Sequence, residues 1–240
     1  MNSNLRRRKK TMKALFINGS PRNNWTTAQM LESAMEGAIE SGAEVEMISL
    51  YDDSFKGCVS CFACKRKNAK TNGLCAYRDA LTPILQKARE ADVLVIGSPI
   101  YFSSVTGPTR SFMERLMFPV LTYNAKFIEE TGEWKSTILD KTVPTGMIYT
   151  MGCPEQMITD CHYPEMFAEA EKFLKMLFGY GETVYTYNAY QFDDYSKYDV
   201  AEYVEPARAK YREEQYPSDL RSAYELGKRL VEKAKEATVQ

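Results

Sequence analysis

The sequence of 240 residues predicts an α/β domain built on a doubly wound, five-stranded parallel sheet. Strand-like and helix-like segments alternate five times, which is the order of a parallel sheet covered by helices on both faces. The run Val-Leu-Val-Ile-Gly at 93–97 is continuously apolar, as expected of a strand buried on both faces. No repeat or break in composition divides the chain. We therefore expect a basic tail over residues 1–12 and a single domain over residues 13–240.

Four further segments complete the expected sheet. Residues 14–17 form a short apolar run that ends in the turn Asn-Gly-Ser-Pro. Residues 44–50 alternate between apolar and polar side chains over most of their length. Residues 143–150 form the fourth strand, with Pro144 acceptable only because it stands at the start. Residues 183–187 form the fifth.

Amphipathic patterns predict the helices. The first helix ends before Gly42. The second begins at Thr82-Pro83, with Thr82 as its cap. The third covers about 106–117, and the fourth ends at Gly179. A last helix runs toward the C-terminus. The expected apolar faces are Leu31, Ala34, Met35, Ala38 and Ile39 in the first helix, Met166, Phe167, Ala170, Phe173, Leu174, Leu177 and Phe178 in the fourth, and Leu220, Ala223, Tyr224, Leu230, Val231 and Ala234 in the last.

Three segments show no regular period. Residues 51–78 hold four of the six cysteines, so we expect a cysteine-rich loop inserted into the domain. Residues 118–141 form a second, irregular insertion. Residues 188–216 are rich in tyrosine and belong to a C-terminal extension.

Composition and charge exclude several classes of protein. A hydrophobic content of 44% and a charged content of 26% indicate a globular chain. Residues 1–13 carry six basic groups and no acid, which leaves 25 basic against 32 acidic groups in the rest of the chain. That acidic body would repel a nucleic-acid backbone. No apolar run is long enough to span a membrane, and the N-terminus lacks a secretory pattern, so we expect a reducing, cytoplasmic location.

The loop after the first strand, residues 18–27 (the first loop), is the first candidate site. Doubly wound sheets bind ligands at the carboxyl ends of their strands. The first loop lacks both the dinucleotide fingerprint and the P-loop pattern, but it offers hydroxyls, amides, a guanidinium and a helix N-terminus, which together can hold a phosphate. Helix capping alone would also explain these polar residues. The groups are those of Ser20, Arg22, Asn23, Asn24, Thr26 and Thr27.

Three blocks at strand ends resemble one known family. They are Asn18-Gly19-Ser20-Pro21-Arg22 followed by Thr26-Thr27, then residues 97–107, and then Tyr149-Thr150-Met151-Gly152. In this order they resemble the NADPH-dependent FMN reductases and their iron-sulfur flavoprotein relatives, in the flavodoxin-like superfamily. The resemblance covers about residues 12–181 and implies a sheet of order 2-1-3-4-5. One departure is Trp25-Thr26-Thr27, where the family often has Gly-Asn-Thr.

The resemblance implies FMN as cofactor and assigns residues to it. The first loop would hold the phosphate, residues 99–106 would lie against the isoalloxazine, and residues 150–152 would close one edge. Reduced nicotinamide would dock transiently, and flavin N5 would carry the chemistry without a catalytic side chain. The implied residues are Ser20, Arg22, Asn24, Thr26, Thr27, Pro99, Ile100, Tyr101, Phe102, Ser103, Ser104, Thr106, Thr150, Met151 and Gly152.

The cysteines follow the pattern C-x2-C-x2-C-x10-C at Cys58, Cys61, Cys64 and Cys75. This set allows three interpretations: a 4Fe-4S cluster, metal-free cysteines that pack or form a redox pair, or structural zinc. Neighbouring basic side chains would lower the thiol pKa values and attract anionic partners. They are Lys65, Arg66, Lys67 and Lys70.

Three functions follow from these features. The first is an oxidoreductase passing electrons from NAD(P)H through FMN to a quinone, an azo or nitro compound, a flavin or a redox protein. The second is an iron-sulfur flavoprotein that carries electrons from a ferredoxin. The third is a non-catalytic flavin and thiol sensor. We also expect a homodimer or higher homo-oligomer, in which residues 118–141 and 185–216 help to cover the flavin, and no nucleic-acid partner.

Overall fold

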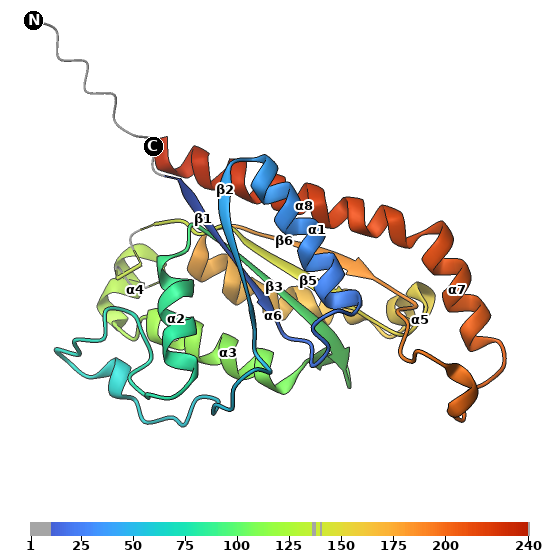
Figure 1. Ribbon diagram of the computed structural model, residues 1–240. Helices are drawn as coiled ribbons and strands as arrows, with labels where there is room; N and C mark the ends of the chain where they lie inside the picture. The colour runs from blue at the N-terminus through green and yellow to red at the C-terminus, as the bar shows by residue number, and fades with distance from the viewer. Residues whose placement is uncertain (1–10, 136–137, 140, 240) are drawn as a thin grey trace, which may run out of the picture.

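The computed structural model describes residues 11–135, 138, 139 and 141–239 (Figure 1). The basic residues of the predicted tail lie outside this range. Five parallel strands pair in the order β2-β1-β3-β5-β6, which is the predicted order once a short extra strand is set aside. These strands are β1 (Met12–Asn18), β2 (Ala43–Ser49), β3 (Val93–Tyr101), β5 (Thr145–Thr150) and β6 (Gly181–Thr186).

A sixth strand, β4 (Ser104–Val105), was not predicted. It pairs antiparallel with the end of β3, which therefore runs beyond the predicted end at residue 97. The two residues between them, Phe102 and Ser103, have φ values of 48° and 64°. Two successive left-handed residues form the tight turn that suits a two-residue hairpin, usually built from Asn and Gly. Because Phe and Ser rarely adopt this conformation, this turn could not be predicted from its residues.

Helices cover both faces of the sheet (Figure 1). On one face, α1 (Thr26–Glu40) and α8 (Tyr216–Val239) pack over a core that includes Phe16, Leu31 and Val95. On the other face, α2 (Leu81–Glu90), α3 (Gly107–Met117) and α6 (Tyr163–Phe178) pack over a core that includes Ile17 and Phe112. The doubly wound prediction is therefore confirmed.

The helices α1 and α8 approach each other closely at two glycines. A Cβ atom on Gly37 would lie 2.0 Å from the carbonyl oxygen of Tyr224, and one on Gly227 would lie 1.9 Å from that of Ala34. No larger residue fits either position without moving a backbone. The glycines therefore let the C-terminal helix lie directly on the first one.

Two segments expected to be irregular contain helices. The range 118–141 holds α4 (Ala125–Thr131), and the range 188–216 holds α7 (Val204–Glu214). Neither helix has an apolar stripe, since α4 buries no residue and α7 buries only Arg208. A short helix, α5 (Glu155–Asp160), precedes α6. Amphipathic periodicity could not reveal α4 or α7.

Some expected apolar faces also need correction. Ile39, Met166 and Phe173 are 54%, 50% and 52% exposed, so they do not belong to the core. The second helix begins at Leu81 rather than at a Thr82 cap. Within the described residues, no helix is long and apolar enough to cross a membrane.

Candidate functional site

The carboxyl ends of β1, β3 and β5 bring the three predicted blocks to one edge of the sheet. Asn18 pairs with Gly97, and Ser98 pairs with Tyr149. The first loop therefore lies next to the hairpin that follows β3 and to the segment that follows β5. These blocks are up to about 130 residues apart in the sequence, and the parallel register of the strands brings them together.

The first loop has a fixed backbone. The amide of Gly19 donates to the carbonyl oxygen of Gly97 at 2.8 Å, and the amide of Ser20 donates to Oδ1 of Asn18 at 2.9 Å. Oγ of Ser20 accepts from the amide of Arg22 at 3.1 Å. A Cβ on Gly19 would lie 1.9 Å from Oγ1 of Thr109. The loop thus needs glycine for packing and fixes the buried Ser20 beside the start of α1.

Buried hydroxyls connect the elements around the first loop. Oγ1 of Thr27 lies 2.7 Å from Oγ1 of Thr150, which joins the first turn of α1 to the end of β5. Thr106 Oγ1 donates to the carbonyl oxygen of Gly19 at 2.8 Å. Thr26 is 5% exposed, so it too lies inside. Five of the predicted hydroxyl residues, including Ser20, are therefore gathered in one buried region.

The N-terminus of α1 is open. Trp25 stands at the N-cap position and makes no side-chain hydrogen bond to the helix. The first N–H groups of a helix have no intrahelical acceptor, and the helix dipole places partial positive charge there. This end of α1 can therefore bind an anion such as a phosphate. Asn24 and Arg22 are exposed beside it.

The hairpin after β3 exposes aromatic side chains. Phe102 is fully exposed at its tip and Tyr101 is 49% exposed. Ser103 Oγ donates to the hydroxyl oxygen of Tyr163 at 2.5 Å, which ties the tip to α6. Pro99 and Ile100 are half-buried, and Ser104 is exposed. The hairpin thus offers flat apolar surface on an anchored backbone.

The segment after β5 is held from two sides. The amide of Met151 donates to the carbonyl oxygen of Thr186 at 3.0 Å, and the Met151 side chain is 2% exposed. The buried Met151 side chain therefore does not face a ligand, and its backbone amide is already paired with β6. The carbonyl oxygen of Gly152 accepts from Nη2 of Arg208 at 2.9 Å. Sequence reasoning missed Arg208, because its partner stands 56 residues away and α7 has no apolar pattern.

The second candidate site is the cysteine loop, residues 51–80. Cys58, Cys61, Cys64 and Cys75 all border one cavity, together with Phe62, Tyr77, Arg115 and Phe118. Among the described residues, however, no three Cys, His, Asp or Glu side chains stand close enough together to bind a metal as they are. The structure brings the predicted cysteines to one place without arranging them as a finished metal site.

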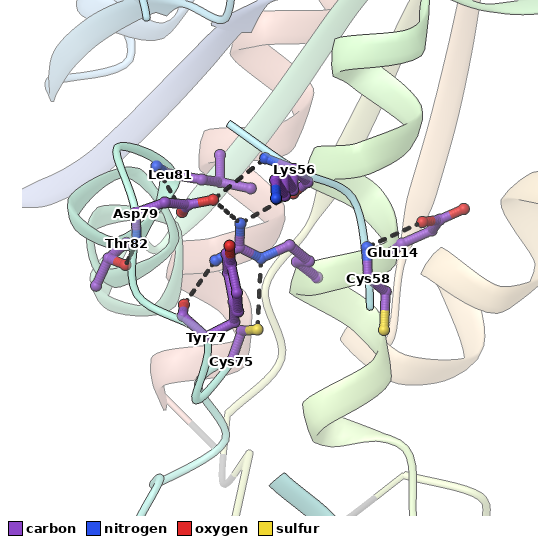
Figure 2. Close-up of polar contacts among 9 residues, drawn as sticks. Lys56, Cys58, Cys75, Tyr77, Asp79, Leu81, Thr82 and Glu114 are labelled. Carbon is purple, nitrogen blue, oxygen red and sulfur yellow. Dashed lines mark hydrogen bonds and ion pairs between the residues drawn. The ribbon is translucent and has the colours of Figure 1, made fainter. Parts of the chain in front are cut away.

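One buried arginine organises this loop (Figure 2). The Arg115 side chain has no exposed surface and comes from α3. Its Nε donates to Sγ of Cys75 at 3.4 Å, and its Nη2 donates to the carbonyl oxygen of Tyr77 at 2.7 Å. Its Nη1 donates to Oδ2 of Asp79 at 2.6 Å and to the carbonyl oxygen of Lys56 at 3.0 Å. Arg115 thus joins both ends of the cysteine loop.

Asp79 couples this arginine to α2. Its Oδ1 accepts from the amide of Leu81 at 3.1 Å, so Asp79 caps the helix that Thr82 was expected to cap (Figure 2). Oγ1 of Thr82 accepts from the amide of Asp79 instead, at 3.1 Å. Burial raises the pKa of the Asp79 carboxyl, but hydrogen bonds from Arg115 and Lys56 outweigh burial and lower that pKa overall.

The expected effect of the basic residues on the thiols is wrong for Cys64. Burial raises the pKa of the Cys64 thiol, and the opposing charge of Lys65 does not cancel this effect. The Lys65 ammonium group hydrogen-bonds to the carbonyl oxygens of Phe118 and Leu121 and lies 4.6 Å from the centre of the Phe118 ring. Lys65 therefore holds the loop against the segment after α3.

Comparison with known proteins decides the family. Residues 12–135, just over half of the chain, match the family described as NADPH-dependent FMN reductase. The chain belongs to this family. The match contains the first loop, the cysteine loop and the hairpin, so the predicted resemblance is confirmed. Membership of this family supports FMN as cofactor.

Relatives and solved structures add detail. The FMN reductase family member described here is 36% identical over 104 residues to an iron-sulfur flavoprotein of Methanocaldococcus jannaschii, covering 43% of this chain and 51% of that protein. It is 40% identical over 104 residues to one of Archaeoglobus fulgidus, covering 43% and 48%. The chain thus spans about half the length of the curated relatives it matches.

The fold is shared more widely. An NAD(P)H:quinone oxidoreductase from Methanothermobacter marburgensis superposes with a TM-score of 0.60 at 16% identity, covering 92% of this chain and 97% of that one. An azoreductase from Bacillus anthracis gives 0.58 at 14% identity, covering 91% and 100%. At such identities the likeness shows the fold alone.

Proposed function

We propose that this member of the FMN reductase family is an FMN-dependent oxidoreductase that takes electrons from NAD(P)H and passes them to a second substrate. The observation that carries this proposal is the uncapped N-terminus of α1, surrounded by buried hydroxyls from three strand ends. These donors match a phosphate monoester, and the adjacent hairpin offers apolar surface for a ring system. The residues present therefore fit FMN.

The chain's own groups would bind and orient the cofactor. Ser20, Thr26 and Thr27, with the exposed Arg22 and Asn24 beside them, would hold the phosphate, and residues 99–106 would lie against the ring. Residues 150–152 would close its polar edge. When bound, FMN supplies hydride and single-electron chemistry that no protein side chain can.

The same hairpin favours transient docking of planar substrates. Tyr101 and Phe102 are exposed at the side of the proposed ring site. A nicotinamide, a quinone or an azo compound could stack there in turn, which predicts ping-pong kinetics. In the homo-oligomer expected from the sequence, a neighbouring chain would help to cover the flavin, and light scattering tests this assembly. A strictly monomeric protein would contradict that part of the proposal.

An anaerobic absorption spectrum tests the function. We expect the protein to retain or rebind FMN and its flavin bands to bleach when NADPH or NADH is added. A protein that neither retains nor rebinds FMN would overturn the proposal. Flavin bands that neither nucleotide bleaches would favour the carrier or the sensor.

A second candidate function, an iron-sulfur electron carrier, rests on the convergence of four cysteines on one cavity. Thiolates in this number suit a 4Fe-4S cluster, which supplies one-electron transfer when bound. Cys58, Cys61, Cys64 and Cys75 would hold it, after a rearrangement that brings their sulfur atoms together. An acidic ferredoxin would suit the basic residues of the loop.

Metal analysis of anaerobically prepared protein tests this candidate. We expect iron and labile sulfide in the wild type and their loss in Cys61→Ser, with flavin content unchanged. Cys161→Ser is the matched control, because Cys161 is exposed and lies outside the cavity. Full flavin content without iron, in the wild type, would exclude the cluster.

A further inference from the structure

We propose that residues 188–198, here named the C-terminal wall, form an additional side of the FMN site and that Gln191 binds the cofactor. The inference rests on the proposed function. The C-terminal wall lies beyond residues 12–135, to which the family match is confined. Two sets of contacts place it, one to the first loop and one to the segment after β5.

Two side chains of the first loop reach the C-terminal wall. Nε1 of Trp25 donates to the carbonyl oxygen of Tyr190 at 2.6 Å. The Arg22 guanidinium donates to the carbonyl oxygen of Gln191 and lies 5.0 Å from the centre of the Trp25 ring. Trp25 is the first residue of Trp25-Thr26-Thr27, where the family often has Gly-Asn-Thr, and here the indole has a specific partner. The first loop is thus adapted to this wall.

Arg208 fixes the other side of the C-terminal wall. This arginine is only 7% exposed. Its Nη1 donates to Oε1 of Gln191 at 3.0 Å and to the hydroxyl oxygen of Tyr195 at 2.6 Å, while Nη2 donates to the carbonyl oxygen of Gly152. The Ala189 amide also donates to the Met151 carbonyl oxygen, at 2.9 Å. The wall and the proposed flavin edge are therefore one hydrogen-bonded unit.

Gln191 has a donor left for a ligand. A Cβ placed on Gly152 would lie 3.0 Å from Nε2 of Gln191, so the amide group stands directly against the proposed flavin edge. Among the described residues, this nitrogen donates to no protein acceptor. Because Arg208 binds the amide oxygen of Gln191, the amide nitrogen is the group that remains for a ligand. The carbonyl oxygens on the polar edge of a flavin are suitable acceptors for it.

Trp25→Phe tests the link between the loop and the wall. Phe keeps an aromatic ring for Arg22 but removes the N–H donor to Tyr190. We expect the FMN dissociation constant, measured by flavin fluorescence, to rise about five-fold, as for the loss of one hydrogen bond. Tyr180→Phe is the matched control, since it also removes one side-chain hydrogen bond, from the Tyr180 hydroxyl to Glu182 at 2.6 Å, and Tyr180 lies just before β6, away from the carboxyl ends of the strands.

Gln191→Met tests the binding residue itself. Met keeps the length of the side chain and removes both polar atoms. We therefore expect the FMN dissociation constant to rise about five- to ten-fold above that of the wild type. A second readout is tryptic cleavage after Lys197, the one basic residue of the C-terminal wall, which FMN should slow in the wild type.

The outcomes separate the two proposals. If the wild type binds FMN while Trp25→Phe and Gln191→Met bind it equally well, the C-terminal wall is only packing and the inference is overturned. Cleavage after Lys197 that FMN does not slow overturns it as well. If the wild type does not bind FMN at all, the proposed function itself fails.

Discussion

The proposed FMN site and the cysteine loop are stabilised in different ways. The FMN site stands at the ends of three paired strands, and many small contacts between hydroxyls and backbone groups fix it. The cysteine loop has no strand among its described residues and only one short 3-10 helix, Ala63–Lys65. A single buried guanidinium from α3 joins its two ends.

This difference predicts which substitutions should affect each site. Loss of one hydroxyl at the FMN site leaves the sheet in place, so each such loss should weaken FMN binding only moderately. Loss of Arg115 removes four contacts at once and leaves a carboxylate without its cation. This single change should therefore lower the free energy of unfolding strongly. The predictions below test this contrast.

The largest expected effect belongs to Arg115→Leu. Removing one partner of a buried ion pair leaves the other uncompensated, which costs about 3 kcal/mol or more. We expect the free energy of unfolding in urea to fall by about that amount, and Cys75 to react faster with a thiol reagent. Arg110→Leu is the control on the same helix, because the Arg110 side chain is 59% exposed and, among the described residues, forms an ion pair only with Glu114.

A small change in stability for Arg115→Leu, equal to that of Arg110→Leu, would contradict the contrast. So would loss of FMN binding from a folded Arg115→Leu protein, because the two sites would then depend on each other. The first result would mean that contacts other than Arg115 hold the cysteine loop.

Thr27→Val tests the FMN site with an intermediate effect. Val keeps the shape of Thr but removes the hydroxyl, which leaves Thr150 without that partner and the phosphate without one donor. We expect the FMN dissociation constant to rise about ten-fold and the free energy of unfolding to fall by about 1 kcal/mol. Thr238→Val is the control, on an exposed position near the end of α8. Unchanged FMN affinity in Thr27→Val would refute the assignment of this hydroxyl to the phosphate.

The sequence predicted those elements that depend on a local pattern of apolar, polar and turn residues. All five long strands were located, because each is a short apolar or alternating segment, and the three blocks of the proposed FMN site lie at strand ends as expected. Helix α7 was missed, because it buries a charged residue rather than an apolar stripe.

Long-range polar contacts could not be predicted. Arg115 reads as an ordinary residue in the last turn of a helix, and nothing local shows that Asp79 is its partner 36 residues away. Trp25 was recognised as a departure from the family pattern, but its partner Tyr190 is 165 residues distant. Such pairs depend on how the elements pack, which a single sequence does not record.

The smallest expected effect concerns pH and again separates the two sites. The folded-state pKa of Asp79 is lowered, because the hydrogen bonds from Arg115 outweigh the opposing effect of burial. The resulting stabilisation is therefore present above the carboxyl group's ordinary pKa and is lost as the pH falls through the lower, folded-state value. Asp79→Asn, which keeps an oxygen acceptor but no charge, should lack this dependence.

We expect wild type to exceed Asp79→Asn by about 1 kcal/mol in unfolding free energy at pH 6, and the gap to close as the pH falls below about 4. Urea unfolding at several pH values measures it. The threonine hydroxyls of the FMN site do not titrate in this range, so Thr27→Val should differ from wild type by the same amount at pH 6 and pH 4. A gap for Asp79→Asn that stays constant with pH would show that the charge of Asp79 contributes nothing. The guanidinium would then hold the cysteine loop through its neutral acceptors, the carbonyl oxygens of Lys56 and Tyr77 and the sulfur of Cys75.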